Sequence, residues 1–153
     1  MRKLLILFLF LTAGLLQAQQ LPEQNWSSEE DFRKDEAVVL ENIVWLENHP
    51  LATATNDTKA MTEFVLNWLA GTPYISVTYD EMFFSSLTNS KKYKFGEKFR
   101  VTYLLGKSYY LIENMEQPIE AKACARGIEG MVTVYNELKK VDPSVRHSLL
   151  EKY

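Results

Sequence analysis

The chain has 153 residues, of which 46% are hydrophobic and 12% aromatic, and its formal net charge is −3. This length fits one domain with a packed core, and this composition excludes disorder of the whole chain. The net negative charge argues against nucleic acid and anionic membrane surfaces as partners, because both are themselves negatively charged.

The first residues have the pattern of an export signal. Arg2 and Lys3 precede an apolar run from Leu4 to Leu16, and the small residue Ala18 follows shortly after it. The run has about 13 residues, fewer than the roughly 20 that cross a bilayer, which favours a cleaved signal over a retained anchor. We therefore expect export to the periplasm or the cell exterior, with no stable membrane insertion afterwards. The expected segments are a signal peptide at residues 1–18, a flexible leader at 19–26 and a single globular helical domain at 27–153.

Cleavage would also change the charge of the chain. Without Arg2 and Lys3, 15 basic residues would stand against 20 acidic ones, a net charge of about −5. Cys124 is the only cysteine, so no intramolecular disulfide can form. Alanines on both sides of it, on a predicted helix, indicate a buried and inert thiol.

The first helix is predicted to begin at Ser27. Ser27 followed by Glu30 has the spacing of a capping box, in which each side chain bonds the backbone of the other residue. Apolar residues from Phe32 onward indicate a helix that is broadly buried in its second half. It ends at Asn48-His49-Pro50, because a residue that precedes proline avoids the helical region.

The second helix, from residues 56–58 to Gly71, is the clearest in the sequence. Its apolar residues recur every three or four positions, which places them on one face. Gly71 is expected to adopt the left-handed conformation that closes a helix, and Pro73 forces an extended exit. We expect this helix to be the hub of a single core. The apolar face consists of Met61, Phe64, Val65, Trp68 and Leu69.

An extended segment is predicted after this helix. Apolar and polar residues alternate through residues 74–79, which is typical of a short strand-like segment with one face in solvent. Asp80 can then cap a short helix that continues to Leu87.

Residues 95–114 fit two structures. Alternating β-branched and aromatic residues on either side of Gly106 and Lys107 suit a hairpin. Phe95, Phe99 and Tyr103, which follow one another at four-residue steps, suit a single helix. The unbroken length and the lack of Asn-Gly or Asp-Gly favour the helix, in which Gly106 would mark a close helix crossing.

The last long helix is predicted from Glu116 to Lys140, with an apolar face that runs from Ile119 to Leu138. A strip of small residues lies beside that face, and we expect Gly106 to pack against it. Asp142 and Pro143 then begin a terminal turn. The strip consists of Ala123, Gly127 and Gly130.

These elements together predict a mostly α fold. The expected architecture is a compact single-domain bundle of about four to five helices, with one short extended segment near residues 74–79. No internal repeat or low-complexity segment divides the chain after the leader.

Several of these stretches resemble a family of small, secreted, uncharacterised bacterial proteins. The likeness covers roughly residues 37–140 and rests on packing residues. It implies a compact, mostly helical fold in which residues 95–114 are helical. It implies no activity, because that family has no assigned function and no catalytic motif. The stretches that carry it are Phe64–Pro73, Ile75–Val77, the aromatic segment around Gly106, and Gly127–Tyr135.

The sequence offers little for catalysis or metal binding. His49 and His147 are the only histidines, and neither stands in a pattern typical of a nucleophile and its base. Two histidines and Cys124 cannot supply a zinc site of the usual spacing. The pairs Asn56-Asp57 and Asp80-Glu81 are explained as helix caps rather than calcium ligands. We predict no catalytic residue, no metal ligand and no cofactor.

Aromatic residues crowd the middle third of the chain. One explanation is a core rich in aromatics whose tyrosine hydroxyls reach the surface. The other is an exposed groove or partner-binding surface, because tyrosines concentrate in such places. The candidate binding residues are Tyr74, Tyr79, Tyr109 and Tyr110.

Two functions remain open from the sequence. One is a non-enzymatic binding or interaction module for an unknown protein or envelope component. The other is a cell-envelope enzyme with a site built from carboxylates and tyrosines. A cleft that brings His49 or His147 within hydrogen-bond reach of a carboxylate would favour the enzyme, and a flat aromatic patch would favour the binding module. The oligomeric state is open as well.

Overall fold

The computed structural model describes residues 21–50, 56–78 and 95–152. Within these ranges the chain is mostly helical and contains no strand, which confirms the predicted fold class. The elements are α1 (Glu29–Asn48), α2 (Asn56–Gly71), α4 (Gly96–Glu113), α5 (Glu120–Val141) and the short 3-10 helix η2 (Leu150–Lys152).

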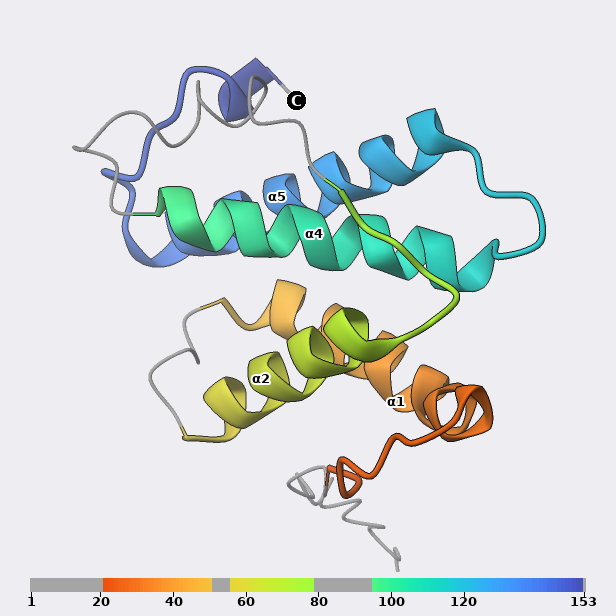
Figure 1. Ribbon diagram of the computed structural model, residues 1–153. Coiled ribbons are helices and arrows are strands. Elements are labelled where there is room, and N and C mark those ends of the chain that lie inside the picture. The colour runs from red at the N-terminus through yellow and green to blue at the C-terminus, as the bar shows by residue number, and fades with distance from the viewer. Residues whose placement is uncertain (1–20, 51–55, 79–94, 153) are drawn as a thin grey trace, which may run out of the picture.

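The helices form two layers. α4 and α5 lie side by side and make the most extensive contact between any two described elements, and the pair formed by α1 and α2 lies against them (Figure 1). α1 packs against α2, α4 and α5 in turn. The prediction that α2 is the hub is therefore wrong, because among the described elements α2 makes extensive contact with α1 alone, whereas α1 makes it with α2, α4 and α5.

Among the described residues the core consists of two clusters, whereas a single one was expected. The first joins α1, α2 and one face of α4, and it contains Phe64, Val65 and Trp68 of the predicted face of α2, all fully buried. The second joins the other side of α4 to α5 and to the C-terminal segment. Its buried members are Phe99, Tyr103, Met131, Val134, Tyr135, Leu138, Val145 and Leu150.

α1 begins one residue later than predicted. Its N-cap is Ser28, whose hydroxyl oxygen accepts the backbone N–H of Asp31 at 3.3 Å. The Asp31 carboxylate accepts the backbone N–H of Ser28 in return, at 3.0 Å, and also that of Ser27, at 3.2 Å. Because one carboxylate satisfies both serine amides, the capping box uses Ser28 and Asp31 instead of Ser27 and Glu30.

Gly71 does not have the predicted left-handed conformation, since no described residue has a positive φ. It is the last residue of α2, and Thr72 still donates its N–H to the carbonyl of Trp68 at 2.9 Å. A Cβ at Gly71 would lie 2.9 Å from the ring of Phe32 on α1. The glycine is thus explained by close packing between α1 and α2 and not by backbone freedom.

Residues 95–114 form a helix and not a hairpin, and Gly106 lies at the predicted crossing. A Cβ at Gly106 would stand 2.8 Å from the carbonyl oxygen of Arg126 and 3.1 Å from Cα of Gly127. A Cβ at Gly127 would stand 2.7 Å from the ring of Tyr103. α4 and α5 can therefore approach this closely only because both positions lack a side chain.

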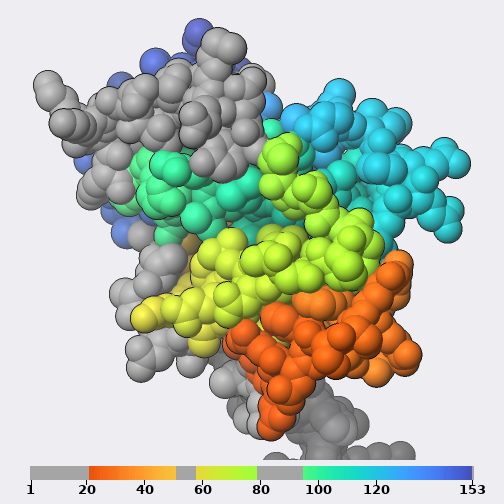
Figure 2. All heavy atoms as spheres, in the orientation of Figure 1, coloured from red at the N-terminus to blue at the C-terminus, as the bar shows by residue number. Residues whose placement is uncertain are grey.

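Two segments outside the helices bind to the helical surface. Residues 72–78 have no regular structure and run across α4 (Figure 2). At the end of this segment, Nζ of Lys107 donates a hydrogen bond to the carbonyl oxygen of Thr78 at 2.8 Å. Residues 21–26 lie against the core through Leu21 and Trp26, and the Trp26 ring stacks on Phe32 with ring centroids 5.3 Å apart. Tyr79 and the short helix predicted to begin at Asp80 lie outside the described residues.

No described helix has both the length and the apolar content that crossing a membrane would require.

Candidate functional site

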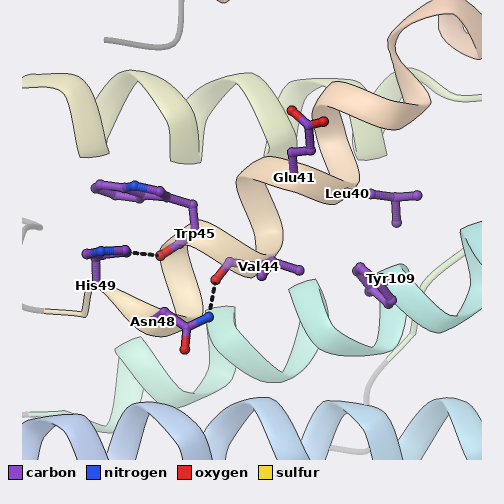
Figure 3. Close-up of a pocket in the computed structure, with 7 residues that line it drawn as sticks. All are labelled: Leu40, Glu41, Val44, Trp45, Asn48, His49 and Tyr109. Carbon is purple, nitrogen blue, oxygen red and sulfur yellow. Dashed lines mark hydrogen bonds between the residues drawn. The ribbon is translucent and has the colours of Figure 1, made fainter. Parts of the chain in front are cut away.

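A groove of about 490 Å³ runs along the second half of α1 and ends at α4 (Figure 3). Five of the residues that line it recur on α1 with helical spacing, on the side away from buried Val39 and Ile43, and His49 is the C-cap of that helix. A volume of this size falls within the range of small-ligand and peptide side-chain sites. The lining residues are Leu40, Glu41, Val44, Trp45, Asn48, His49 and Tyr109.

An aromatic pair occupies the C-terminal end of the groove. The rings of Trp45 and His49 stack, with centroids 4.3 Å apart and planes inclined by 16°. Nδ1 of His49 lies 2.8 Å from the carbonyl oxygen of Trp45. A carbonyl can only accept, so Nδ1 carries the proton and Nε2 is the acceptor of the neutral ring. The stack and this hydrogen bond together fix the orientation of His49.

The centre of the groove is apolar and exposed. Val44 is 40% exposed, which makes it one of three large hydrophobic residues in the described part of the chain that solvent reaches so freely. Leu40 lies one turn before it on the same face. Asn48 donates its side-chain amide to the carbonyl of Val44, one turn earlier on α1, at 2.8 Å.

Tyr109 of α4 forms the other end of the groove. The guanidinium of Arg126 lies 4.8 Å from the centre of its ring, at cation–π distance. Burial raises the pKa of the Tyr109 hydroxyl, and the nearby carboxylate of Glu113 adds to this effect. The residue is therefore a neutral phenol over the physiological pH range, with its ring held from behind by a cation.

Arg126 is itself fixed by an ion pair between α5 and α1. Its Nη1 and Nη2 donate to Oε1 and Oε2 of Glu47 at 2.9 and 2.7 Å, and the Glu47 side chain is 6% exposed. Burial raises the pKa of Glu47, and the hydrogen bond from Arg126 opposes that shift. Gly130 provides the space, because a Cβ there would lie 3.2 Å from Cδ of Glu47.

The structure separates the four predicted tyrosines. Tyr109 lines the groove, whereas Tyr74 lies against the first half of α1, where its hydroxyl donates to Glu36 at 2.8 Å. Burial raises the pKa of the Tyr74 hydroxyl, and the hydrogen bond to Glu36 contributes. Tyr110 is half-buried on α4 and does not line the groove, and Tyr79 is outside the described residues. Of the three described tyrosines, only Tyr109 lines the groove.

The two histidines also lie in different places. His49 lines the groove, while the backbone N–H of His147 donates to the hydroxyl of Tyr135 in the C-terminal segment, at 3.2 Å. Burial lowers the pKa of His147. Glu41 shares the groove with His49 but precedes it by eight residues, a rise of about 12 Å along the helix. This separation is too large for a direct hydrogen bond between the side chains of Glu41 and His49.

Comparison with known proteins gives no relative. No family model matches the chain, and neither a curated protein nor a solved structure matches it. The resemblance to small secreted bacterial proteins therefore gains no support from these comparisons.

Metal chemistry is not indicated by the described part of the chain, where no group of three or more histidine, cysteine, aspartate or glutamate side chains could hold an ion. The groove also escaped sequence reasoning, and one signal could have found it. Leu40, Val44 and Trp45 widen the apolar surface of α1 beyond the stripe through Val39 and Ile43. The apolar surface of α1 is therefore wider than the stripe that its neighbours bury completely, and Val44 is left 40% exposed.

Proposed function

We propose that the protein is an exported binding module and that the groove along α1 is its ligand surface. The observation that carries this proposal is the exposure of Val44 beside the Trp45–His49 stack, in a groove that Tyr109 of α4 closes at one end. Apolar and aromatic side chains that together line an open groove are typical of interaction sites. Export rests on the basic and apolar pattern of residues 1–18.

The rigidity of the groove supports this proposal. His49 is held by its stack and its hydrogen bond to the backbone, and Tyr109 is backed by the cation of Arg126. Side chains that are already ordered lose little conformational entropy when a ligand binds. Such preorganisation is an advantage for a binding surface, and a chance patch of exposed residues would have no reason to possess it.

A cell-envelope enzyme is the second candidate, and one observation favours it. Glu41 and His49 line the same groove, so a substrate that spans it could contact both a carboxylate and an imidazole. The rise of about 12 Å between them means that no base and acid are coupled in advance. The binding module therefore remains the better supported function.

Two variants of groove residues test the binding function. Val44→Asp places a charge in the apolar centre, and Trp45→Ala removes the aromatic pair. We expect each to abolish retention of envelope components on the immobilised protein, measured as saturable binding. Val141→Asp is the matched control, since Val141 is 66% exposed on α5 and lies outside the groove. Equal retention by all three variants would refute the proposal.

Export is tested separately by the N-terminal sequence of the protein recovered from outside the cytoplasm. We expect Gln19 as the first residue, because the predicted cut follows Ala18. Recovery of the uncut chain from the cytoplasm alone would contradict this part of the proposal.

A further inference from the structure

We infer that the ion pair of Glu47 and Arg126 is a pH switch that controls the α4 end of the groove, a regulatory role that rests on the binding function proposed above. When the Glu47 carboxylate takes up a proton in mild acid, Arg126 is no longer held behind Tyr109, and this end of the groove loses its fixed shape. The contacts of the pair, the space around it and the chemistry of the guanidinium each support this role.

A chain of contacts connects Glu47 to the groove. The Glu47 carboxylate on α1 accepts hydrogen bonds from both terminal nitrogens of Arg126, at 2.9 and 2.7 Å. The guanidinium of Arg126, on α5, lies 4.8 Å from the centre of the Tyr109 ring. Tyr109 lines the groove from α4 (Figure 3). The shape of one end of the groove therefore depends on a carboxylate that does not itself line it.

The ion pair is enclosed by neighbouring helix backbones. A Cβ at Gly130 would lie 3.2 Å from Cδ of Glu47, and a Cβ at Gly106 would lie 3.1 Å from Nη1 of Arg126. The Glu47 side chain is 6% exposed and that of Arg126 is 20% exposed. Water therefore has little access to the carboxylate, and Arg126 is the partner that can move when the charge of Glu47 changes.

Protonation of Glu47 is incompatible with this paired geometry. A guanidinium carries only donors, so two parallel hydrogen bonds require two acceptor oxygens on the carboxylate. A carboxylic acid presents one acceptor oxygen and one O–H donor, and this O–H would face a nitrogen that also donates. One of the two hydrogen bonds is therefore lost, together with the negative charge that balances Arg126.

Charged groups near the pair favour the release of Arg126. Glu129 follows Arg126 by one turn on α5, and its negative charge attracts the guanidinium. Once Glu47 is neutral, this attraction draws Arg126 away from its place behind Tyr109. The groups that face this part of α1 are Arg126 and Glu129 from α5 and Tyr109, Glu113 and Lys98 from α4, whereas Lys59 and Glu63 of α2 pair with each other at the surface.

Glu47 changes its charge in mild acid, whereas Arg126 and Tyr109 do not. Burial raises the pKa of Glu47 above its ordinary value of 4.5, the hydrogen bond from Arg126 opposes this shift, and the charge of Glu129 adds to it. A guanidinium stays protonated throughout, and burial keeps the Tyr109 hydroxyl neutral by raising its pKa. Because the pKa of Glu47 is raised in the folded state, the native chain takes up this proton at a higher pH than the unfolded chain would. The switch therefore operates within the folded molecule.

NMR of the full chain over a range of pH tests the inference, with carbon-13 in the glutamate carboxyl groups and the tyrosine rings. We expect the Tyr109 ring signals to shift with the same midpoint as the Glu47 carboxyl, above pH 4.5. Glu47→Gln removes the charge and keeps the shape, and its amide again offers one acceptor and one donor group. At pH 7 its Tyr109 signals should resemble those that the wild type reaches only in acid, and they should lack the titration step.

Two matched controls address other groups that could move the Tyr109 signals. Glu113→Gln removes the carboxylate that acts on the Tyr109 hydroxyl, and His49→Gln removes the histidine of the groove, since histidines also titrate in mild acid. Both variants should keep the step of the wild type. A Tyr109 midpoint that differs from that of Glu47, a step that persists in Glu47→Gln, or a step that is lost in either control would overturn the inference.

Retention of a solubilised envelope extract on the immobilised chain separates this inference from the binding function. Retention at pH 7 should fall at least about fivefold in Glu47→Gln, the lower end of typical coupling between two sites. Retention that depends on Val44 but is unchanged in Glu47→Gln would overturn the switch and leave the binding function standing. Retention that does not respond to Val44→Asp would overturn the binding function, and the regulatory role would fall with it.

Discussion

The two halves of the molecule are held together by different physical means. Between α4 and α5 the backbones touch, because Gly106 and Gly127 lack the side chains that would keep them apart. Between α1 and α2 aromatic rings fill the space, with Phe32, Phe64 and Trp68 all buried. The interface between α4 and α5 therefore depends on residues without side chains, and the interface between α1 and α2 depends on large side chains.

This difference determines how each half should respond to change. A backbone contact cannot adjust by rotating a side chain, so an added methyl group must move a whole helix. An aromatic contact can rearrange when a methyl group is added, but it leaves a large cavity when a ring is removed. The ion pair of Glu47 and Arg126 joins the two halves, since it links α1 to α5.

The largest expected effect is the removal of a ring from the aromatic half. Trp68→Ala should lower the free energy of unfolding by about 3–5 kcal/mol, because Trp68 is fully buried and a cavity would remain. It would also leave the carbonyl of Phe32 without its 3.0 Å hydrogen bond from the indole N–H. Urea denaturation measures this change. An unchanged midpoint would mean that the aromatic cluster does not hold α1 and α2 together.

The link between the halves should be next in size. Arg126→Met should cost about 3 kcal/mol at pH 7, the lower end of the range for breaking a buried ion pair. The cost stays at that end because burial already raises the pKa of Glu47, so this carboxylate can take up a proton once its partner is gone.

The pH dependence of this variant tests the explanation. A raised folded-state pKa means that the native state binds the proton more tightly, so the carboxyl favours folding at low pH and loses that effect as pH rises through the raised value. The deficit of Arg126→Met should therefore shrink between pH 7 and pH 5, whereas that of Trp68→Ala should stay constant. A deficit that grows on acidification would contradict the buried position of Glu47.

A matched pair of glycine substitutions compares the two interfaces directly. Gly106→Ala should destabilise by about 1–3 kcal/mol, because its Cβ would stand 2.8 Å from a backbone carbonyl. Gly71→Ala should cost less, because its Cβ would meet only the ring of Phe32, which can rotate. Thermal melting of both variants checks the order. Equal destabilisation would show that the interface between α1 and α2 adjusts to an added methyl group no better than the interface between α4 and α5.

The smallest effect concerns the exposed end of α1. Hydrogen bonds from the side chain of Ser28, and then from Ser27, lower the pKa of Asp31 from 3.8 to about 2. A depressed pKa stabilises the fold above the unfolded value and loses this contribution as pH falls through the folded one. The stability difference between wild type and Asp31→Ala should therefore vanish between pH 4 and pH 2, as followed by circular dichroism. The control Glu30→Ala should not reproduce this loss, and the two carboxylates Asp31 and Glu47 should respond to acid in opposite directions.

Much of the helical structure could be predicted from local patterns. The apolar face of α2 and the end of α1 before Pro50 follow from spacing and from the restriction that proline imposes on its neighbour. The crossing of Gly106 with the strip that contains Gly127 was also predicted and is present. The choice of Ser28 over Ser27 as N-cap was not, because both serines fit the motif and only the bonds to Asp31 distinguish them.

The sequence by itself determined the mostly helical character and the apolar periodicity of α2, because these depend on contacts three or four residues apart. The tertiary structure alone decided which helix contacts all the others, why Gly71 is small and where the exposed groove lies. Those features depend on distances between residues far apart in the chain, such as Gly71 and Phe32 or Trp45 and Tyr109. No local pattern contains those distances, because the packing of whole helices sets them.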